Sequence, residues 1–435
     1  MRSRRRRPLR PWAPLLALLL PLAGSAADWP HWRGEQRTGV TSEPSGWANG
    51  QWAVKTPAWS ASVGRGSTSP LVVGDRLYTL GWHGGQDRLV CLNAATGEKL
   101  WEQGYPAPEY GRHAVGDQFF YSGVSATPEY DPQTGFLYTL GVDGALHCWN
   151  TRENGKAVWK LNLYDTYGVP QRPQITRRGD SRRDYGYTAA PLVHGDWLIV
   201  EVGDDEGTLM AFDKRTGTRR WTSESKVPAG HAAGLAPMTV EGVPCVAVLT
   251  LEGLLVARLD SANAGKTVAT HPWATDYANN IPTPAVQGNS VLITSNYNHR
   301  KIARFDVSLS GLRKAWEQPY PSGVCSPVIY KDRVYLASRG LHCLDWATGE
   351  LKWDGGKFGD VASIIATGDD RLIVWANEGD LALVESAVRS PDQYTELVFL
   401  PKLFATEVWP HVVLANSRLY CKDRAGNLKC FRTSH

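Results

Sequence analysis

Short apolar segments separated by turn residues follow one another along nearly the whole chain. In SPLVVGDRLYTL (69–80), an apolar segment, a Gly-Asp turn and an alternating segment occur in succession. Alternation with a period of two residues between turns rich in Gly, Asp and Asn is typical of short β-strands. The sequence has no long apolar stripe with a helical period. The pattern therefore predicts an all-β fold.

This unit occurs eight times along the chain. Variants of its opening lie at 127–140, 190–200, 236–248, 283–294, 326–337, 364–374 and 412–422. A second phrase closes several units, as in LNAATGEKLW (92–101) and LDWATGELKW (344–353), where a Thr-Gly turn leads into a strand with Trp. Four short strands to a unit, repeated around a ring, indicate a β-propeller. We expect eight four-stranded antiparallel blades, with seven as the alternative count.

The two ends of the chain supply the strand that the last unit lacks. The eighth unit stops at NLKCF (427–431) without a Trp strand, and PAWSAS (57–62) belongs to no unit. We expect residues 57–62 to form the outer strand of the last blade, because this closes the ring and leaves no open sheet edge.

The first 27 residues have the layout of a secretory signal peptide. An arginine-rich start precedes the apolar run APLLALLLPLA (13–23) and the small residues at 24–27. The apolar run is too short to span a bilayer comfortably. We predict a signal peptide over 1–27 and one propeller domain over 28–435, periplasmic or secreted and without a transmembrane anchor. The signal segment does not distinguish export by the general secretory route from export by the twin-arginine route.

The charge of the mature chain gives no indication of nucleic-acid binding. The signal segment holds six Arg and no acid, so its removal changes the net charge from +4 to −2. A nucleic-acid-binding domain normally carries a basic surface. We therefore expect a protein or a small polar or carbohydrate ligand as the partner.

The phrase A-x-D-x-x-T-G-x-x-x-W, seen at 93–101, 213–221 and 345–353, resembles the repeat of pyrroloquinoline-quinone-like (quinoprotein-type) eight-bladed propellers. The opening DWPHWRG (28–34) is similar to that of exported propeller proteins of planctomycete and verrucomicrobial type. The chain also resembles the periplasmic lipoprotein scaffold that assists outer-membrane β-barrel assembly. These resemblances imply the fold, and a fold alone does not determine function.

The resemblance implies two classes of function. One is a quinoprotein dehydrogenase that binds pyrroloquinoline quinone and Ca²⁺, and the other is a non-catalytic scaffold whose loop face binds another protein. The family's alcohol dehydrogenases carry a vicinal disulfide, whereas this sequence has no Cys-Cys pair and no C-x-x-C-H haem motif. We favour a monomeric scaffold without a cofactor. A carbohydrate-active enzyme is a further alternative, for which no acid/base pair can be assigned.

The cysteines fit a structural role. Four of them occupy a repeat position that holds alanine in other units, as expected of small core residues: Cys91, Cys148, Cys343 and Cys430. His147 and His342 recur at one register beside two of these cysteines, which favours a structural role over metal binding. The sequence leaves open whether Cys421 and Cys430 form a disulfide across the last hairpin.

Two connections are longer than the rest and predict the binding site. They span 102–127 and 160–190, join blades 1 to 2 and 2 to 3, and so lie side by side on one face of the ring. Long loops on a rigid scaffold often carry function, and Arg and Tyr suit carboxylate or phosphate binding and stacking. The alternative is a solvated loop whose charges pair with one another. With shorter links of the same face, the candidate residues are Arg112, His113, Arg182, Arg183, Asp184, Tyr185, Tyr187, His231, Tyr277 and Asn279.

Overall fold

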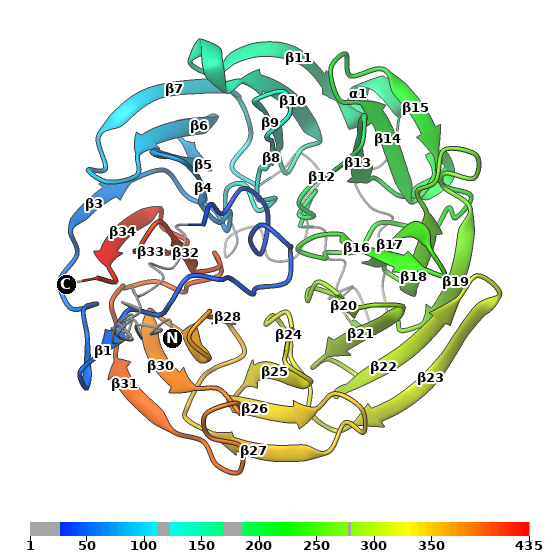
Figure 1. Cartoon of the computed structure of the whole chain (residues 1–435). Coiled ribbons are helices and arrows are strands. Elements are labelled where there is room, and N and C mark those ends of the chain that lie inside the picture. Colours follow the sequence, from blue (N-terminus) through cyan, green and yellow to red (C-terminus); the bar gives the residue numbers. More distant parts are fainter. Residues whose placement is uncertain (1–26, 111–121, 169–184, 277–279, 435) are drawn as a thin grey trace, which may run out of the picture.

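Eight four-stranded antiparallel sheets form a ring around a central axis (Figure 1). The computed structural model describes residues 27–110, 122–168, 185–276 and 280–434. Each sheet is a blade, with one strand at the axis and one at the rim. The all-β, eight-bladed propeller predicted from the repeat is confirmed, and the alternative count of seven is not observed.

The first four blades take their strands in chain order from the axis to the rim. Blade 1 contains β4 (Leu71–Val73), β5 (Arg76–His83), β6 (Gln86–Asn93) and β7 (Lys99–Pro106). Blade 2 contains β8 (Glu129–Asp131), β9 (Phe136–Leu140), β10 (Ala145–Asn150) and β11 (Lys156–Asn162). Blade 3 contains β12 (Leu192–His194), β13 (Trp197–Glu201), β14 (Leu209–Asp213) and β15 (Arg219–Thr222). Blade 4 contains β16 (Ala236–Val240), β17 (Val243–Leu249), β18 (Gly253–Arg258) and β19 (Thr267–Pro272).

The next blades follow the same order. Blade 5 contains β20 (Ala285–Gln287), β21 (Ser290–Ser295), β22 (Lys301–Ser308) and β23 (Gly311–Gln318). Blade 6 contains β24 (Val328–Tyr330), β25 (Arg333–Ser338), β26 (Gly340–Asp345) and β27 (Leu351–Gly355). Blade 7 contains β28 (Ala362–Ala366), β29 (Arg371–Ala376), β30 (Asp380–Glu385) and β31 (Glu396–Leu400). Outside the blades lie the hairpin β1 (Trp47–Ala48) and β2 (Gln51–Trp52), the helix α1 (Leu163–Tyr167), and two short 3₁₀ turns (Thr151–Glu153 and Asp204–Glu206).

Blade 8 joins the two ends of the chain. It contains β32 (Val413–Ala415), β33 (Arg418–Lys422) and β34 (Asn427–Arg432), and its outer strand is β3 (Trp59–Ser62). Trp59 lies opposite Cys430 in antiparallel register. The N-terminal strand therefore closes the ring, as predicted.

The repeated phrase is a device that joins neighbouring blades. The carboxylate of Asp345 accepts hydrogen bonds from the backbone N–H groups of Ala347 (2.9 Å) and Thr348 (3.1 Å), which fixes an Asx turn. Gly349 follows at φ 76°, where a side chain is disfavoured. A Cβ on Gly349 would lie 2.7 Å from the ring of Trp316, the tryptophan of the preceding blade. The glycine thus serves both the turn and the packing of the neighbouring indole.

A Tyr–Cys–Trp triplet explains the cysteines of the repeat. In blade 2, Cys148 lies between Tyr138 on one strand and Trp159 on the other. The Tyr138 hydroxyl (2.9 Å) and the Trp159 indole (3.1 Å) both donate to the carbonyl of Lys214 in blade 3. A small residue between the two rings lets them converge on one acceptor. The same register occurs in Tyr78–Cys91–Trp101, Tyr335–Cys343–Trp353 and Tyr420–Cys430–Trp59.

The register of the last hairpin shows whether Cys421 and Cys430 form a disulfide. All seven cysteines are buried thiols. Cys430 lies opposite Tyr420, whereas Cys421 lies opposite Lys429. Because successive side chains of a strand point to opposite faces, the two cysteines lie on different faces of blade 8 and do not pair.

The ring has two distinct faces. The links from each outer strand to the next inner strand lie on one face, together with the connections between the second and third strands, and we call this the link face. The Thr-Gly turns lie on the opposite face, because an antiparallel strand carries its two connections at opposite ends.

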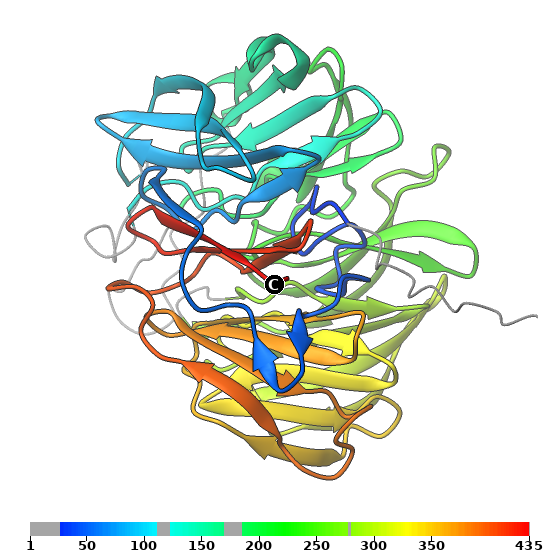
Figure 2. The ribbon, with the colours of Figure 1, turned by 60° about the vertical axis from the view of Figure 1, so that its left-hand side comes forward.

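The N-terminal segment 27–45 fills the ring instead of trailing from it (Figures 1 and 2). Trp29 exchanges backbone hydrogen bonds of 2.7 and 3.0 Å with Val72 in blade 1. Thr41 donates to the carbonyl of Ala366 in blade 7 at 2.9 Å. This segment, which we call the axial segment, therefore bonds to the inner strands of blades 1 and 7, on either side of blade 8. The repeat pattern of the sequence does not indicate this arrangement.

Candidate functional site

The two longest links join blade 1 to blade 2 and blade 2 to blade 3, so their described ends lie in neighbouring sectors of the link face, as the sequence predicts. They span 107–128 and 163–191, whereas the links into blades 6 and 7 span only 319–327 and 356–361. The blades themselves pack against one another, so the links carry the sequence that is free to vary.

Most of the predicted binding residues lie outside the described part of the chain. These are Arg112, His113, Arg182, Arg183, Asp184, Tyr277 and Asn279. The three described ones come from two links. The backbone N–H of Tyr185 donates to Nε2 of His231 at 3.2 Å, and their rings lie 4.5 Å apart edge to face. Tyr187 is 1% exposed and packs in the core shared by blades 2 and 3, so its ring serves the fold.

The axial segment closes the centre of the ring. The indole of Trp32 donates to Oγ1 of Thr283 at 3.0 Å, and its ring lies 4.1 Å from the ring of His411. Thr283 and His411 belong to the links into blades 5 and 8, on different sides of the ring, so Trp32 lies across the axis. Burial lowers the pKa of His411 to about 3, which keeps this imidazole neutral at ordinary pH.

Charged side chains fix the axial segment to the blades. The carboxylate of Glu129 in β8 is fully buried and accepts from Arg37 (2.9 Å), from Nδ1 of His31 (3.1 Å) and from the N–H of Val193 in blade 3 (2.9 Å). Burial opposes ionisation of Glu129, but Arg37 and His31 lower its pKa to about 2. Arg33 is also buried, and its guanidinium donates to the carbonyl of Pro327 in the link into blade 6.

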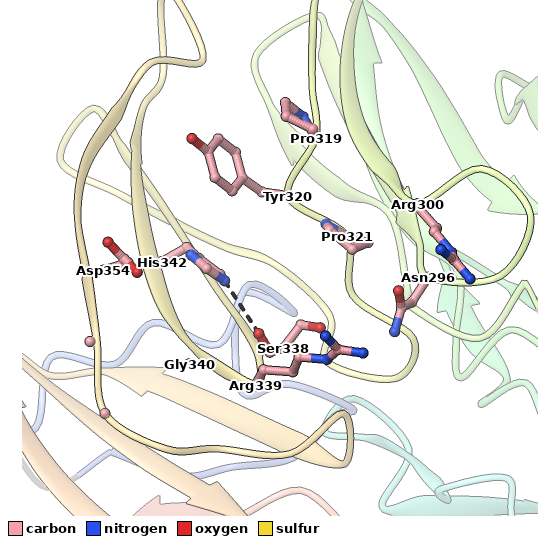
Figure 3. A pocket seen from close by; sticks show the side chains of 12 residues that line it. Asn296, Arg300, Pro319, Tyr320, Pro321, Ser338, Arg339, Gly340, His342 and Asp354 are labelled. Atoms are coloured by element: carbon pink, nitrogen blue, oxygen red, sulfur yellow. Dashed lines mark hydrogen bonds between the residues drawn. The ribbon is translucent and has the colours of Figure 1, made fainter.

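A groove of about 580 Å³ lies between blades 5 and 6 on the link face (Figure 3). Nε2 of His342 lies 3.3 Å from the carbonyl of Ser338, and the Tyr320 ring lies 5.4 Å from the imidazole. Asn296 (3.0 Å) and Ser338 (2.8 Å) donate to the two carboxylate oxygens of Asp360. Arg300, Arg339 and Asp354 also line the groove. Sequence reasoning missed this groove, because its residues come from short connections that look like ordinary turns.

The described residues contain no group of three or more His, Cys, Asp and Glu side chains placed to hold a metal ion. His147 and His342 recur at one register of the repeat. His147 is buried in its blade, and His342 lines the groove between blades 5 and 6. None of the helices in the described ranges has the length and apolar character needed to cross a membrane.

The ring, its Asp-Thr-Gly-Trp phrase and its closing strand define an eight-bladed propeller built from pyrroloquinoline-quinone-like repeats. The chain belongs to the family described as outer membrane protein assembly factor BamB, whose model matches residues 44–122 and 123–355.

Individual relatives agree with this assignment. The chain is 25% identical to BamB of Burkholderia pseudomallei over 311 residues, which cover 69% of this chain and 68% of that protein. It is also 25% identical to BamB of Bordetella pertussis over 319 residues, with 68% of each chain covered. The crystal structure of BamB from Moraxella catarrhalis matches with a TM-score of 0.59 at 16% identity, covering 87% of this chain and 98% of that one. The last likeness concerns the fold alone.

Proposed function

We propose that this protein is an exported, non-catalytic scaffold that binds a partner protein at its link face during the assembly of outer membrane proteins. The observation that carries the proposal is the family match over residues 44–355, together with relatives named as assembly factors. The signal-like segment 1–27 supports a periplasmic location. A protein partner also fits Arg and Tyr on the long links, because these residue types are enriched at interface hot spots.

The partner surface is proposed to include the long links. A triple variant, Arg112→Ala with Arg182→Ala and Arg183→Ala, should leave the unfolding midpoint nearly unchanged, because exposed ion pairs each contribute about 0–1 kcal/mol. In cells, crosslinking followed by affinity capture and mass spectrometry should recover an outer-membrane assembly protein with the wild type and much less of it with the variant. Capture of the same protein in equal amount by both would contradict the assignment of these links.

The dehydrogenase alternative makes a separate prediction. Under it, the purified protein given pyrroloquinoline quinone and Ca²⁺ would oxidise alcohols or aldoses in a dye-linked assay. We expect no activity above the background without cofactor, since the sequence lacks the Cys-Cys pair of the family's alcohol dehydrogenases. Turnover in this assay would overturn the non-catalytic proposal.

A further inference from the structure

The connection between the second and third strands of each blade has a common backbone requirement. At the start of the third strand, or within two residues before it, one residue adopts a positive φ. Six blades place glycine there, which avoids strain in this conformation. These glycines are Gly85, Gly144, Gly207, Gly253, Gly379 and Gly426.

Blades 5 and 6 depart from this rule. Arg300 adopts φ 48° directly before β22, and Arg339 adopts φ 62° directly before β26. A residue with a Cβ is strained in this region, so glycine would serve both turns better. Neither guanidinium makes an ion pair or hydrogen bond with another described residue. The two arginines therefore have no visible role in holding the fold.

Both arginines line the same groove (Figure 3). Their guanidinium groups and the Asn296 amide lie toward one end of the groove, whereas His342 and Asp354 lie toward the other. The nearby carboxylate of Asp360 is already held at both oxygens by Asn296 and Ser338. One end of the groove thus presents two guanidinium groups that pair with no described carboxylate, although Asp360 beside Asn296 and Asp354 in the lining also bring negative charge to the groove.

We propose that the groove between blades 5 and 6 binds a carboxylate of an extended, acidic peptide segment, through Arg300 and Arg339. Arginine binds a carboxylate with two parallel N–H···O bonds, which gives both affinity and orientation. In two adjacent blades, a strained backbone places an arginine on the same surface. Binding of a ligand explains this arrangement best.

A peptide fits better than an isolated small acid because the groove extends beyond the arginines. Tyr320 and the two prolines Pro319 and Pro321 wall its length with flat, weakly polar surface. Such a wall suits a chain that passes through the groove. The choice of a peptide rests on the proposed scaffold function, since a scaffold binds protein.

The test uses the residue that the other blades place at this position. The variant Arg300→Gly with Arg339→Gly removes both charges and relieves both strained turns, so its unfolding midpoint should equal or exceed that of the wild type. Arg215→Gly, an exposed arginine in a Thr-Gly turn of the opposite face, is the control for a charge change alone. The probe is a fluorescein-labelled peptide of alternating Glu and Ser, with a Gln and Ser peptide of equal length, measured by fluorescence anisotropy on the purified full chain.

We expect the Glu peptide to bind at least about tenfold more tightly than the Gln peptide, and the double glycine variant to lose at least about tenfold of that affinity. Arg215→Gly should bind as the wild type does. Equal binding of the two peptides, or undiminished binding by the double variant, would overturn the proposal. Displacement of the peptide by an equal concentration of free glutarate would show a small-acid site and overturn the peptide assignment. Peptide binding without capture of an assembly protein in cells would contradict the scaffold function while supporting the ligand chemistry of the groove.

Discussion

Asp87 offers a quantitative test of the interface between blades 1 and 2. It lies in β6, is 1% exposed, and has no ionic partner among the described residues. Its carboxylate and the Tyr105 hydroxyl press against Gly141 of blade 2, where an added Cβ would lie 2.9 and 3.0 Å from the two oxygens. Burial raises the pKa of Asp87 to about 7, although the Tyr105 hydroxyl lowers it.

The pH dependence follows from this pKa. The unfolded chain loses the Asp87 proton near pH 3.8, whereas the folded chain keeps it to about pH 7. The protonated form therefore stabilises the fold fully below about pH 3.8, and this contribution is lost as the pH rises to about 7. A pKa raised from 3.8 to about 7 lowers the free energy of unfolding by about 4 kcal/mol above pH 7, and by about 2 kcal/mol at pH 5. Asp87→Asn keeps the shape and removes the charge.

Urea unfolding followed by tryptophan fluorescence at pH 5, 6, 7 and 8 measures this effect. The Asn variant should gain free energy of unfolding over the wild type, and the gain should grow by roughly 2–3 kcal/mol between pH 5 and pH 8. Asp75→Asn, an exposed carboxylate of the same blade, should follow the wild type at every pH. A gain that is the same at pH 5 and pH 8 would refute the argument.

Three further predictions concern the axis and the blade interfaces. Burial lowers the pKa of Lys422 to about 7, so wild-type stability should rise between about pH 7 and pH 10.5, and Lys422→Met should lack this rise in the same urea assay. Trp316→Ala removes a buried indole and its 3.0 Å bond to the carbonyl of Trp346, and should cost about 3–5 kcal/mol; a loss below about 1 kcal/mol would contradict its role at the interface. Deleting residues 28–45 should lower the unfolding midpoint markedly, because Trp29, Trp32 and Arg33 are buried in the ring, and an unchanged midpoint would show that the axial segment is dispensable.

The fold was predictable because a propeller repeats its chemistry. The Asp-Thr-Gly-Trp phrase uses a turn, a positive φ and a large ring for one purpose in several blades, so each copy confirms the others. Closure of the ring was predictable from the number of strands in each unit. The last unit lacks one strand, and residues 57–62 form a strand that belongs to no other unit.

The candidate site was harder to predict from the sequence, because it depends on residues that depart from the repeat pattern. DWPHWRG (28–34) has buried residue types but no partner in the sequence pattern, and its position across the axis results from contacts with links far along the chain. Arg300 and Arg339 looked like ordinary turn residues until their φ values could be compared with the glycines of other blades. The tryptophans of the repeated phrase also differ from one another, since Trp221 is only half-buried whereas Trp101, Trp316 and Trp353 are buried.

The position of the axial segment also bears on how the link face keeps its shape. The hydrogen bonds between β3 and β34 close the last blade, so local opening there would free β34 from the N-terminal strand. The axial segment precedes β3 in the chain and bonds to blades 1, 7 and 8, with Glu43 accepting from the backbone N–H of Ser417 at 2.9 Å. It therefore holds the inner strands together even when the outer strand opens. Because the groove of blades 5 and 6 lies away from this seam, opening of β3 should leave Arg300 and Arg339 in place.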